Sequence, residues 1–268
     1  MSLLQKHLSM TKMQGAGNSF LITSENISLK IRAKLTEKLC DINFGVGADG
    51  MVFLNSSKDG NVDWDFYNSD GSEAEFCGNA ARCVALYIFD QNSNHKKIQI
   101  KTRAGLVACE MMDAQVVQVQ MPKVEWLSKS LVIPGWPAPV VWLNTGVPHV
   151  VIEVAALADL KKYKSEAALI RSSDRLGPSG SNVTFVFAQG PEDISAVTFE
   201  RGVEDFTLAC GTGAVAAAYY MMEKNFTHGC QVKMPGGSLK VTKNEDQVLM
   251  TGEAYKIANI QWSLEGEI

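Results

Sequence analysis

Several hallmarks of common protein classes are absent from this sequence of 268 residues. No cysteine pair has the Cys-x-x-Cys spacing and the four histidines are scattered, so the pattern argues against a zinc site. No block of basic residues occurs and the formal net charge is −4, which argues against a nucleic-acid partner. The longest apolar stretch, 214–222, is too short to cross a bilayer, so we expect no membrane association.

Residues 1–13 also lack the apolar core and the small-residue cleavage site of a signal peptide. We therefore expect a cytoplasmic protein, in a compartment that keeps thiols reduced. The composition, 46% hydrophobic and 20% charged, is ordinary for a globular protein with one large domain or two of about 130 residues each. The six cysteines are expected to be free thiols: Cys40, Cys77, Cys83, Cys109, Cys210 and Cys230.

Motifs for cofactors are missing as well. The segment 13–20 contains Gly15-Ala16-Gly17, but it lacks the third glycine and the strand-to-helix context of a dinucleotide site. No lysine stands in a recognisable pyridoxal phosphate setting, and no phosphate loop occurs. We therefore expect a protein that holds neither a cofactor nor a metal.

The chain does contain an internal duplication. The block CGNAA at 77–81 resembles the block CGTGA at 210–214, which lies 133 residues further along. Short α/β segments often look alike, but several matches in one order and at one offset favour two structurally similar halves. Three further blocks repeat at nearly the same offset: 48–53 with 181–186, 65–68 with 198–201, and 99–105 with 231–237.

The expected secondary structure repeats in the same order. Residues 79–90 and 212–224 are rich in alanine with long apolar faces, which predicts one helix in each half. We expect an α+β fold in which a sheet wraps a largely buried helix, with the three prolines of 123–139 marking the crossing between the halves. Strands are predicted at 51–54, 64–67, 98–102, 106–111 and 116–121, and again at 182–188, 196–200, 231–234, 238–242 and 248–251.

Both motif cysteines, Cys77 and Cys210, precede a predicted helix. The first N–H groups of a helix have no partner inside it, and the helix dipole adds partial positive charge there. A thiol in that position has a lowered pKa, and a carboxylate can dock on the free N–H groups. Gly78 and Gly211 would let a ligand approach the backbone closely.

If the two helix starts face one cleft, a substrate carboxylate receives N–H donors from both helices. Its α-carbon then lies between a thiolate and a thiol, which is the acid–base pair that inversion of a carbon centre requires. The charge that develops on the carboxylate is stabilised by the helix termini. The alternative is that both cysteines are buried small hydrophobes, the commonest role of this residue; their matched, glycine-flanked contexts favour catalysis.

Polar residues near the two motifs are candidates for substrate binding. Asn68 ends a predicted strand shortly before Cys77, and Arg201 in the equivalent place could bind a carboxylate through two hydrogen bonds. Glu200 could accept from an ammonium group, although a surface turn and a solvated ion pair are the ordinary roles of such residues. Asn18 could contact a ligand, and His149 could polarise Cys210, although an isolated histidine is more often structural.

These residues resemble the diaminopimelate epimerase family over nearly the whole chain. The two cysteine blocks, 68–83 and 200–214, carry most of the resemblance, and 45–50 and 15–18 add to it. The resemblance implies two pseudo-symmetric domains, each a curved mixed sheet around a central helix, with the active site in the cleft between them. It also implies 1–123, joined by 258–268, as the half with Cys77, and 124–257 as the half with Cys210.

The resemblance further implies an isomerase that interconverts LL- and meso-2,6-diaminopimelate for lysine and peptidoglycan precursors, without pyridoxal phosphate or metal, as a homodimer. Cys77 and Cys210 would be the acid–base pair, with His149 and Glu200 also in the catalytic set. The residues that bind the distal amino-acid group of the substrate would be Asn18, Asn68, Asn182, Glu200 and Arg201. Donors to the reacting carboxylate would be Gly78, Asn79, Gly211 and Thr212.

Four positions depart from the family pattern. Gln14, Ser19 and Ala80 stand where the family usually has His, Asp and Gly, and Val147 replaces the asparagine of an Asn-Pro-His turn. Val147 and Gln14 motivate an alternative, a racemase or epimerase of another amino acid. The apolar side chain of Val147 removes one polar contact to the substrate. A third hypothesis is a non-catalytic amino-acid-binding protein on the same scaffold.

Overall fold

The structure is a computed structural model that describes residues 7–56, 61–91, 96–157, 163–245 and 247–264. The chain forms two compact units, one of residues 1–119 with 253–268 and the other of residues 120–252. Within the described residues, no helix is long and apolar enough to span a membrane.

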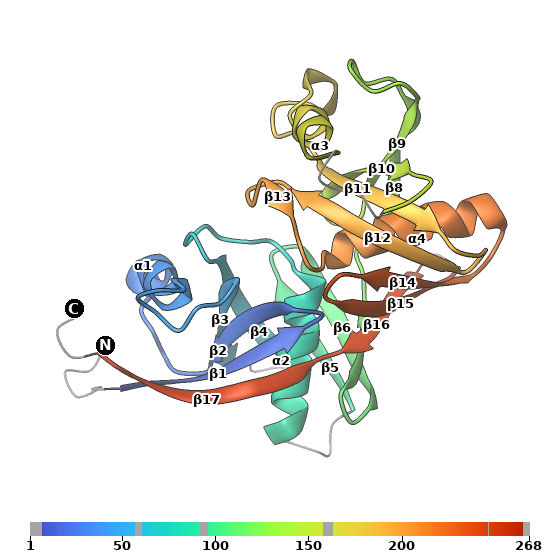
Figure 1. Cartoon of the computed structure of the whole chain (residues 1–268). Helices are drawn as coiled ribbons and strands as arrows, with labels where there is room; N and C mark the ends of the chain where they lie inside the picture. The colour runs from blue at the N-terminus through green and yellow to red at the C-terminus, as the bar shows by residue number, and fades with distance from the viewer. Residues whose placement is uncertain (1–6, 57–60, 92–95, 158–162, 246, 265–268) are drawn as a thin grey trace. The chain divides into compact units, whose positions relative to one another are not determined.

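The first unit is a mixed sheet with two helices (Figure 1). Its strands lie in the order β17-β1-β2-β3-β4-β5-β6-β7, with parallel pairing at β2–β3 and β4–β5 and antiparallel pairing elsewhere. The elements are β1 (His7–Gly15), β2 (Asn18–Thr23), α1 (Leu29–Cys40), β3 (Gly50–Ser56), β4 (Val62–Asn68), α2 (Gly78–Gln91), β5 (Lys97–Thr102), β6 (Gly105–Asp113), β7 (Val116–Gln120) and β17 (Tyr255–Ser263).

The second unit repeats this arrangement. Its strands lie in the order β8-β9-β10-β11-β12-β14-β15-β16, again with two parallel pairs, β10–β11 and β12–β14. The elements are β8 (Glu125–Leu131), β9 (Val140–Asn144), β10 (Pro148–Glu153), α3 (Lys164–Arg171), a 3-10 turn (Asp174–Leu176), β11 (Asn182–Ala188), β12 (Asp193–Glu200), β13 (Asp205–Phe206), α4 (Gly211–Asn225), β14 (Gly229–Met234), β15 (Gly237–Asn244) and β16 (Gln247–Glu253).

The predicted α+β fold of two pseudo-symmetric halves is therefore confirmed. The predicted strands and both predicted helices are present, with ends shifted by a few residues at most. Helices α1 and α3, a second helix in each unit, were not predicted from the sequence. Residues 123–139 were predicted to be a connection, whereas this segment contains β8, which pairs with β9 inside the second unit.

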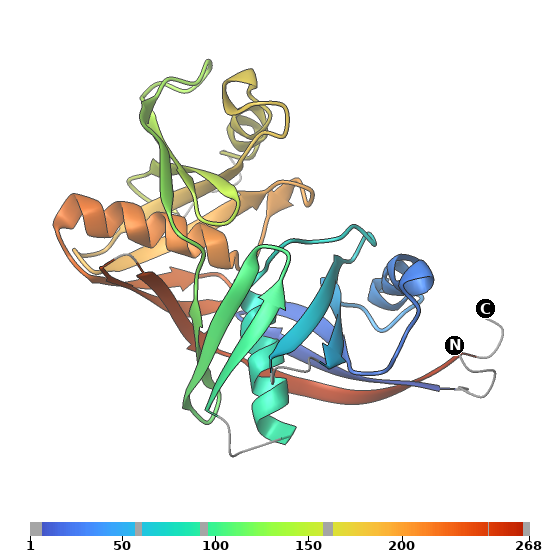
Figure 2. The same ribbon diagram turned by 180° about the vertical axis from the view of Figure 1, so that it is seen from behind.

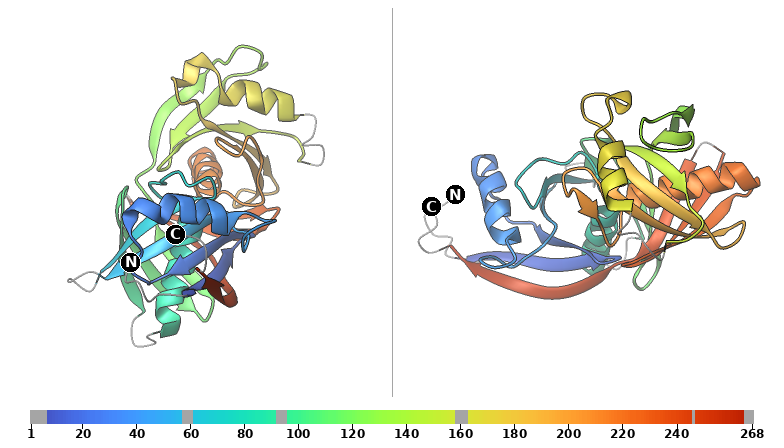
Figure 3. Two further views of the ribbon diagram at one scale, coloured as in Figure 1. Left: turned by 90° about the vertical axis from the view of Figure 1, so that its left-hand side faces the viewer. Right: turned by 45° about the horizontal axis from the view of Figure 1, so that its top comes forward.

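The two repeats exchange their last strands. β8 follows the first repeat in the chain but pairs with β9 of the second unit. β17 follows the second repeat but pairs with β1 of the first unit along its whole length, from His7 opposite Ser263 to Gln14 opposite Tyr255 (Figure 3). Each sheet is therefore completed by a strand from the other end of the duplication.

The helices that carry the motif cysteines are buried along most of their length. In α2, seen from behind in Figure 2, the residues from Gly78 to Leu86 are all buried, and in α4 the residues from Gly211 to Ala218 are buried. Small side chains at these positions let each helix lie close to its sheet, where β-branched and aromatic residues provide a dense apolar surface. The first turn of each helix is thus held rigidly, which fixes the residue in front of it.

Gly213 sets the distance between α4 and its sheet. A Cβ at this position would lie 2.2 Å from Thr198 Oγ1 of β12 and 3.1 Å from Thr184 Oγ1 of β11. The equivalent residue of α2 is Ala80, so the closer approach is specific to the second unit.

We predict that Gly213→Ala destabilises the protein by about 1–2 kcal/mol, because overpacking outweighs the gain of about 1 kcal/mol in helix propensity. Gly190→Ala is the matched control, because its Cβ would meet nothing closer than 3.9 Å. Chemical denaturation gives the two free energies of unfolding. A Gly213→Ala protein as stable as the control would contradict the close approach.

Candidate active site

Cys77 lies directly before α2, as the sequence predicts. Its carbonyl oxygen accepts the N–H of Ala81 at 2.9 Å, which places Cys77 at the cap position of the helix. Its side chain is half-buried, and the thiol is 3.9 Å from Oδ1 of Asn18, the first residue of β2. The same oxygen accepts the side-chain N–H of Asn79 at 3.3 Å. The structure thus brings together three residues from the predicted site.

The loop between β4 and α2 is a hydrogen-bonded turn. Asn68 donates its side-chain N–H to Ser72 Oγ at 3.0 Å, and its backbone N–H bonds to the Ser72 carbonyl at 2.8 Å. Gly71 has a φ of +76°, which glycine adopts without strain. Asn68 is exposed at the end of β4, where its amide remains accessible to solvent.

Cys210 occupies the equivalent position in the second unit. It is the N-cap of α4, its carbonyl accepts the N–H of Ala214 at 2.8 Å, and only 7% of its surface is exposed. Its thiol lies 3.4 Å from Thr212 Oγ1. The two cysteines therefore have the same backbone role but differ in exposure and in their neighbours.

A buried polar network adjoins Cys210. His149 of β10 is fully buried, with Nε2 at 2.9 Å from Thr212 Oγ1 and Nδ1 at 2.9 Å from Thr184 Oγ1. Thr184 in turn lies 3.0 Å from Thr198 Oγ1 on the neighbouring strand β12. His149 thus reaches Cys210 through the hydroxyl of Thr212.

The tautomer of His149 follows from Asn182. The Asn182 Oδ1 atom accepts the backbone N–H of Arg201 at 2.8 Å, so the amide nitrogen is the group that faces His149 Nε2 at 3.2 Å. Burial, with a smaller contribution from the Arg201 charge, lowers the pKa of His149 to about 3, so the ring is neutral at pH 7. Nε2 therefore accepts from the Asn182 amide, and Nδ1–H donates to Thr184 Oγ1.

Glu200 ends β12 beside this network, and Arg201 follows it in the turn. The Glu200 carboxylate accepts a hydrogen bond from the hydroxyl of Thr207. Arg201 is exposed, and its guanidinium donates to the carbonyl of Ser179 at 3.4 Å. An exposed guanidinium with such a weak contact can reorient toward a ligand carboxylate at little energetic cost.

The sequence analysis missed two parts of this region. Thr184 and Thr198 face each other across β11 and β12, and only the strand register reveals that pairing. Arg82 of α2 has a side chain with no exposed surface, and no local pattern in the sequence predicts its burial. The period-two spacing of Asn182 and Thr184 was the one signal that could have linked Thr184 to the site.

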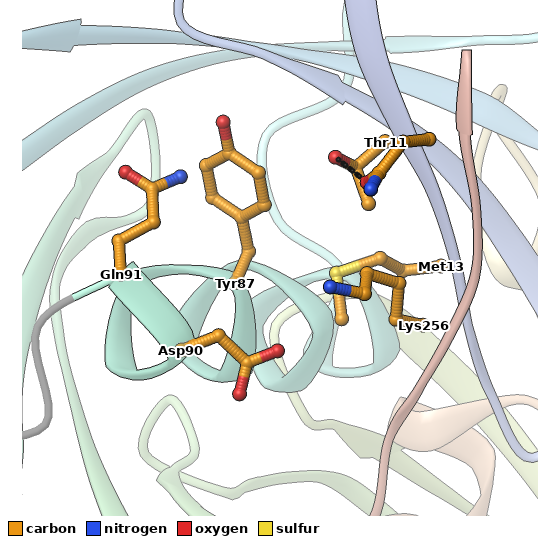
Figure 4. A pocket seen from close by; sticks show the side chains of 7 residues that line it. Thr11, Met13, Tyr87, Asp90, Gln91 and Lys256 are labelled. Carbon is orange, nitrogen blue, oxygen red and sulfur yellow. Dashed lines mark hydrogen bonds between the residues drawn. The ribbon is translucent and has the colours of Figure 1, made fainter.

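A pocket in the first unit is distinct from the position of Cys77. It has a volume of about 210 Å³ and lies at the C-terminal end of α2, whereas Cys77 precedes the N-terminal end (Figure 4). The described residues contain no group of three or more His, Cys, Asp or Glu side chains placed to hold a metal ion. All six cysteines carry free thiols, as expected. The pocket is lined by Thr11, Met13, Tyr87, Asp90, Gln91, Lys256 and Asn259.

Comparison with known proteins gives one consistent family. The family profile described as diaminopimelate epimerase matches residues 10–127 and 141–257. The diaminopimelate epimerases of Flavobacterium psychrophilum and Aquifex aeolicus are each 34% identical to this chain, over 91% and 92% of it and 94% of each relative. A probable proline racemase from Agrobacterium radiobacter K84 has the same fold, with a TM-score of 0.75 over 97% of this chain and 94% of that one at 12% identity.

We predict that His149 makes the protein less stable in acid. Its pKa falls from 6.5 to about 3 on folding, so the unfolded chain binds the extra proton and stability declines as the pH falls below 6.5. Between pH 6.5 and 5 the advantage of wild type over His149→Gln in free energy of unfolding should shrink by about 1.6 kcal/mol. If NMR shows that the His149 imidazole titrates near pH 6.5 in the folded protein, this assignment is contradicted.

Proposed function

The chain belongs to the diaminopimelate epimerase family, and from that premise we propose that it interconverts LL- and meso-2,6-diaminopimelate with Cys77 and Cys210 as the proton-transfer pair. It is therefore an isomerase, acting on a small amino-acid substrate. The observation that carries the proposed mechanism is the matched position of the two cysteines, each at the N-terminal cap of a buried helix.

The two thiols carry both proton transfers of the proposed reaction. A thiolate removes the α-proton, and the electron pair of the broken C–H bond moves into the adjacent carboxylate. The opposite thiol then gives its proton to the other face of the carbon, so the configuration inverts and the two sulfurs exchange roles. Both isomers are thus substrates, and no net proton is consumed.

The helix termini supply the electrostatic stabilisation that this step requires. The N–H groups of Gly78 and Asn79 begin α2, and those of Gly211 and Thr212 begin α4; N–H groups at the first positions of a helix point out of its N-terminal end. We propose that both sets hydrogen-bond the reacting carboxylate, whose negative charge grows as the α-proton leaves. The buried first turns keep these donors fixed during the reaction.

The remaining polar residues would hold the distal amino-acid end. Arg201 suits the distal carboxylate and Glu200 the distal ammonium group, with the amides of Asn18, Asn68 and Asn182 completing the set. His149 would act on Cys210 through Thr212, since the two hydrogen bonds of that hydroxyl lead to the ring and the thiol. A homodimer in the cytoplasm is part of the same proposal.

A racemase of another amino acid is the second candidate, and Val147 is the observation that favours it. Val147 is half-buried in the turn between β9 and β10, two residues before His149. Its isopropyl group cannot make the hydrogen bond that an asparagine would offer to the substrate there. A substrate with a smaller polar end would therefore lose less binding free energy.

We predict that Cys77→Ser and Cys210→Ser each lower the turnover number for diaminopimelate at least 1,000-fold, on the order expected for loss of a general acid or base. Cys40→Ala and Cys230→Ala are matched controls, one buried cysteine in each unit, and should retain activity within about threefold. Full activity in either serine variant would refute the two-thiol mechanism.

We predict that diaminopimelate is the preferred substrate in a panel that also contains proline, hydroxyproline, glutamate and lysine. Chiral chromatography measures each inversion, and kcat/KM for diaminopimelate should exceed the others at least 100-fold, because only its distal amino-acid group engages Arg201 and Glu200. If another amino acid inverts while diaminopimelate stays unchanged, the second candidate is correct.

A further inference from the structure

Arg171, the last residue of α3, bonds to two separate segments of the second unit. Its carbonyl oxygen accepts the backbone N–H of Ser181 at 3.1 Å. Its guanidinium Nη2 atom lies 2.7 Å from Oε1 of Glu204. Ser181 directly precedes β11 and Glu204 directly precedes β13, and both of these strands pair with β12. The end of one helix therefore joins the segments that lead into two different strands.

The first segment, residues 179–182, passes very close to the end of α3. A Cβ at Gly180 would lie 2.1 Å from the Arg171 carbonyl oxygen, and Gly180 has a φ of +64°, so glycine is required there. Asn182, at the end of this segment, is buried, and its Oδ1 accepts the backbone N–H of Arg201 at 2.8 Å. The position of the Asn182 amide thus follows that of the helix end.

The second segment is the turn of residues 201–204, which connects β12 to β13. The Glu204 backbone N–H bonds to the Glu200 carbonyl at 2.8 Å. Glu204 has a φ of +56°, a conformation that a residue with a Cβ rarely adopts, so the surrounding contacts must hold it there. Its Oε1 atom accepts the Gly202 N–H at 3.0 Å and also pairs with Arg171. The Glu204 carboxylate therefore links the turn to α3.

Arg201 belongs to one of these segments and contacts the other. Its backbone is part of the turn, and its guanidinium donates to the carbonyl of Ser179 in the first segment at 3.4 Å. This hydrogen bond is long, so it alone does not fix the side chain. Because Arg171 bonds to both segments, the placement of Arg201 relative to the Asn182 amide depends on Arg171.

A second ion pair connects α3 to β13 and is more exposed. Lys164 Nζ lies 2.6 Å from Asp205 Oδ2, and the exposed fractions of the two side chains are 53% and 50%. Ion pairs of this kind contribute little, because solvent screens the charges and both side chains lose freedom. The Arg171 side chain is 23% exposed, so its charge is screened less than that of Lys164. Lys164 therefore provides a control from the same helix.

We propose that Arg171 is a positioning residue for the distal amino-acid group of the substrate: it holds the turn that carries Arg201 against the segment that carries Asn182. This inference rests on the proposed function and deepens it, because it names a residue outside the binding set that determines how well the set fits its ligand. Arg171 acts through Arg201. Its loss therefore weakens recognition of the distal group and leaves the proton-transfer step at the cysteines largely unchanged.

Limited digestion with trypsin tests this attachment of the turn without substrate. The exposed bond between Arg201 and Gly202 is a cleavage site, and its cleavage requires local opening of the turn. Arg171→Gln should raise the rate of cleavage after Arg201 at least fivefold, measured by peptide mass spectrometry, whereas Lys164→Gln should change it less than twofold. An unchanged rate in folded Arg171→Gln protein, or an equal rise in Lys164→Gln, would overturn the proposal.

Two further variants keep this test decisive. Glu204→Gly removes the same ion pair at a φ that glycine adopts freely, so it should raise the cleavage rate in the same direction if Arg171→Gln does not fold. Arg171→Lys should keep the rate within about twofold of wild type, because the ion pair joins one nitrogen to one oxygen and an ammonium group can form it.

A double-mutant cycle tests whether Arg171 acts through Arg201. Arg171→Gln should lower kcat/KM for the inversion of diaminopimelate at least tenfold, mainly by raising KM. In an Arg201→Gln background the same change should lower kcat/KM less than threefold, because the group that Arg171 positions is gone. Equal losses in both backgrounds would reveal a general structural effect and overturn the proposal. If wild type does not invert diaminopimelate, the proposed function fails, and the digestion still decides whether Arg171 holds the turn.

Discussion

The rigid first turn of a buried helix is the constraint on which the rest of this protein depends. A cysteine at a helix cap meets unpaired N–H groups and a partial positive charge only if the helix start stays in place. Burial of α2 and α4 against their sheets provides that rigidity. The small residues of both helices, the close approach at Gly213 and the completion of each sheet by an exchanged strand all serve to hold these two turns.

Duplication supplies two such turns, and divergence gives them different surroundings. Proton transfer across a carbon needs one donor and one acceptor, and the two units surround their thiols with different groups. The first unit has a buried arginine, Arg82, in the helix that follows Cys77, and in the second unit the neutral ring of His149 contacts the Thr212 hydroxyl. The second arrangement buries polar groups, which is tolerable because hydrogen bonds such as those of His149 and Asn182 satisfy them.

Local patterns in the sequence predicted much of the fold and the centre of the candidate site. The strand Asn182–Ala188 was predicted with its observed limits, because its apolar, β-branched residues are bounded by turns. The helix α1 was missed although Arg32, Thr36 and Leu39 recur at helical spacing, since polar residues rarely mark a buried face. The exchange of β8 and β17, the Thr184–Thr198 contact and the burial of Arg82 depend on which strands pair, and a local pattern does not encode that choice.

Solvent deuterium labelling during a single early phase of turnover tests the two-thiol account most directly. LL-diaminopimelate is converted in D₂O, and the residual substrate and the meso product are separated. Mass spectrometry then measures the deuterium content of each. If separate groups remove and return the proton, the product carries one deuterium at the inverted carbon while the residual substrate remains unlabelled. Deuterium in the residual substrate as early as in the product, or a product without deuterium, would contradict the account.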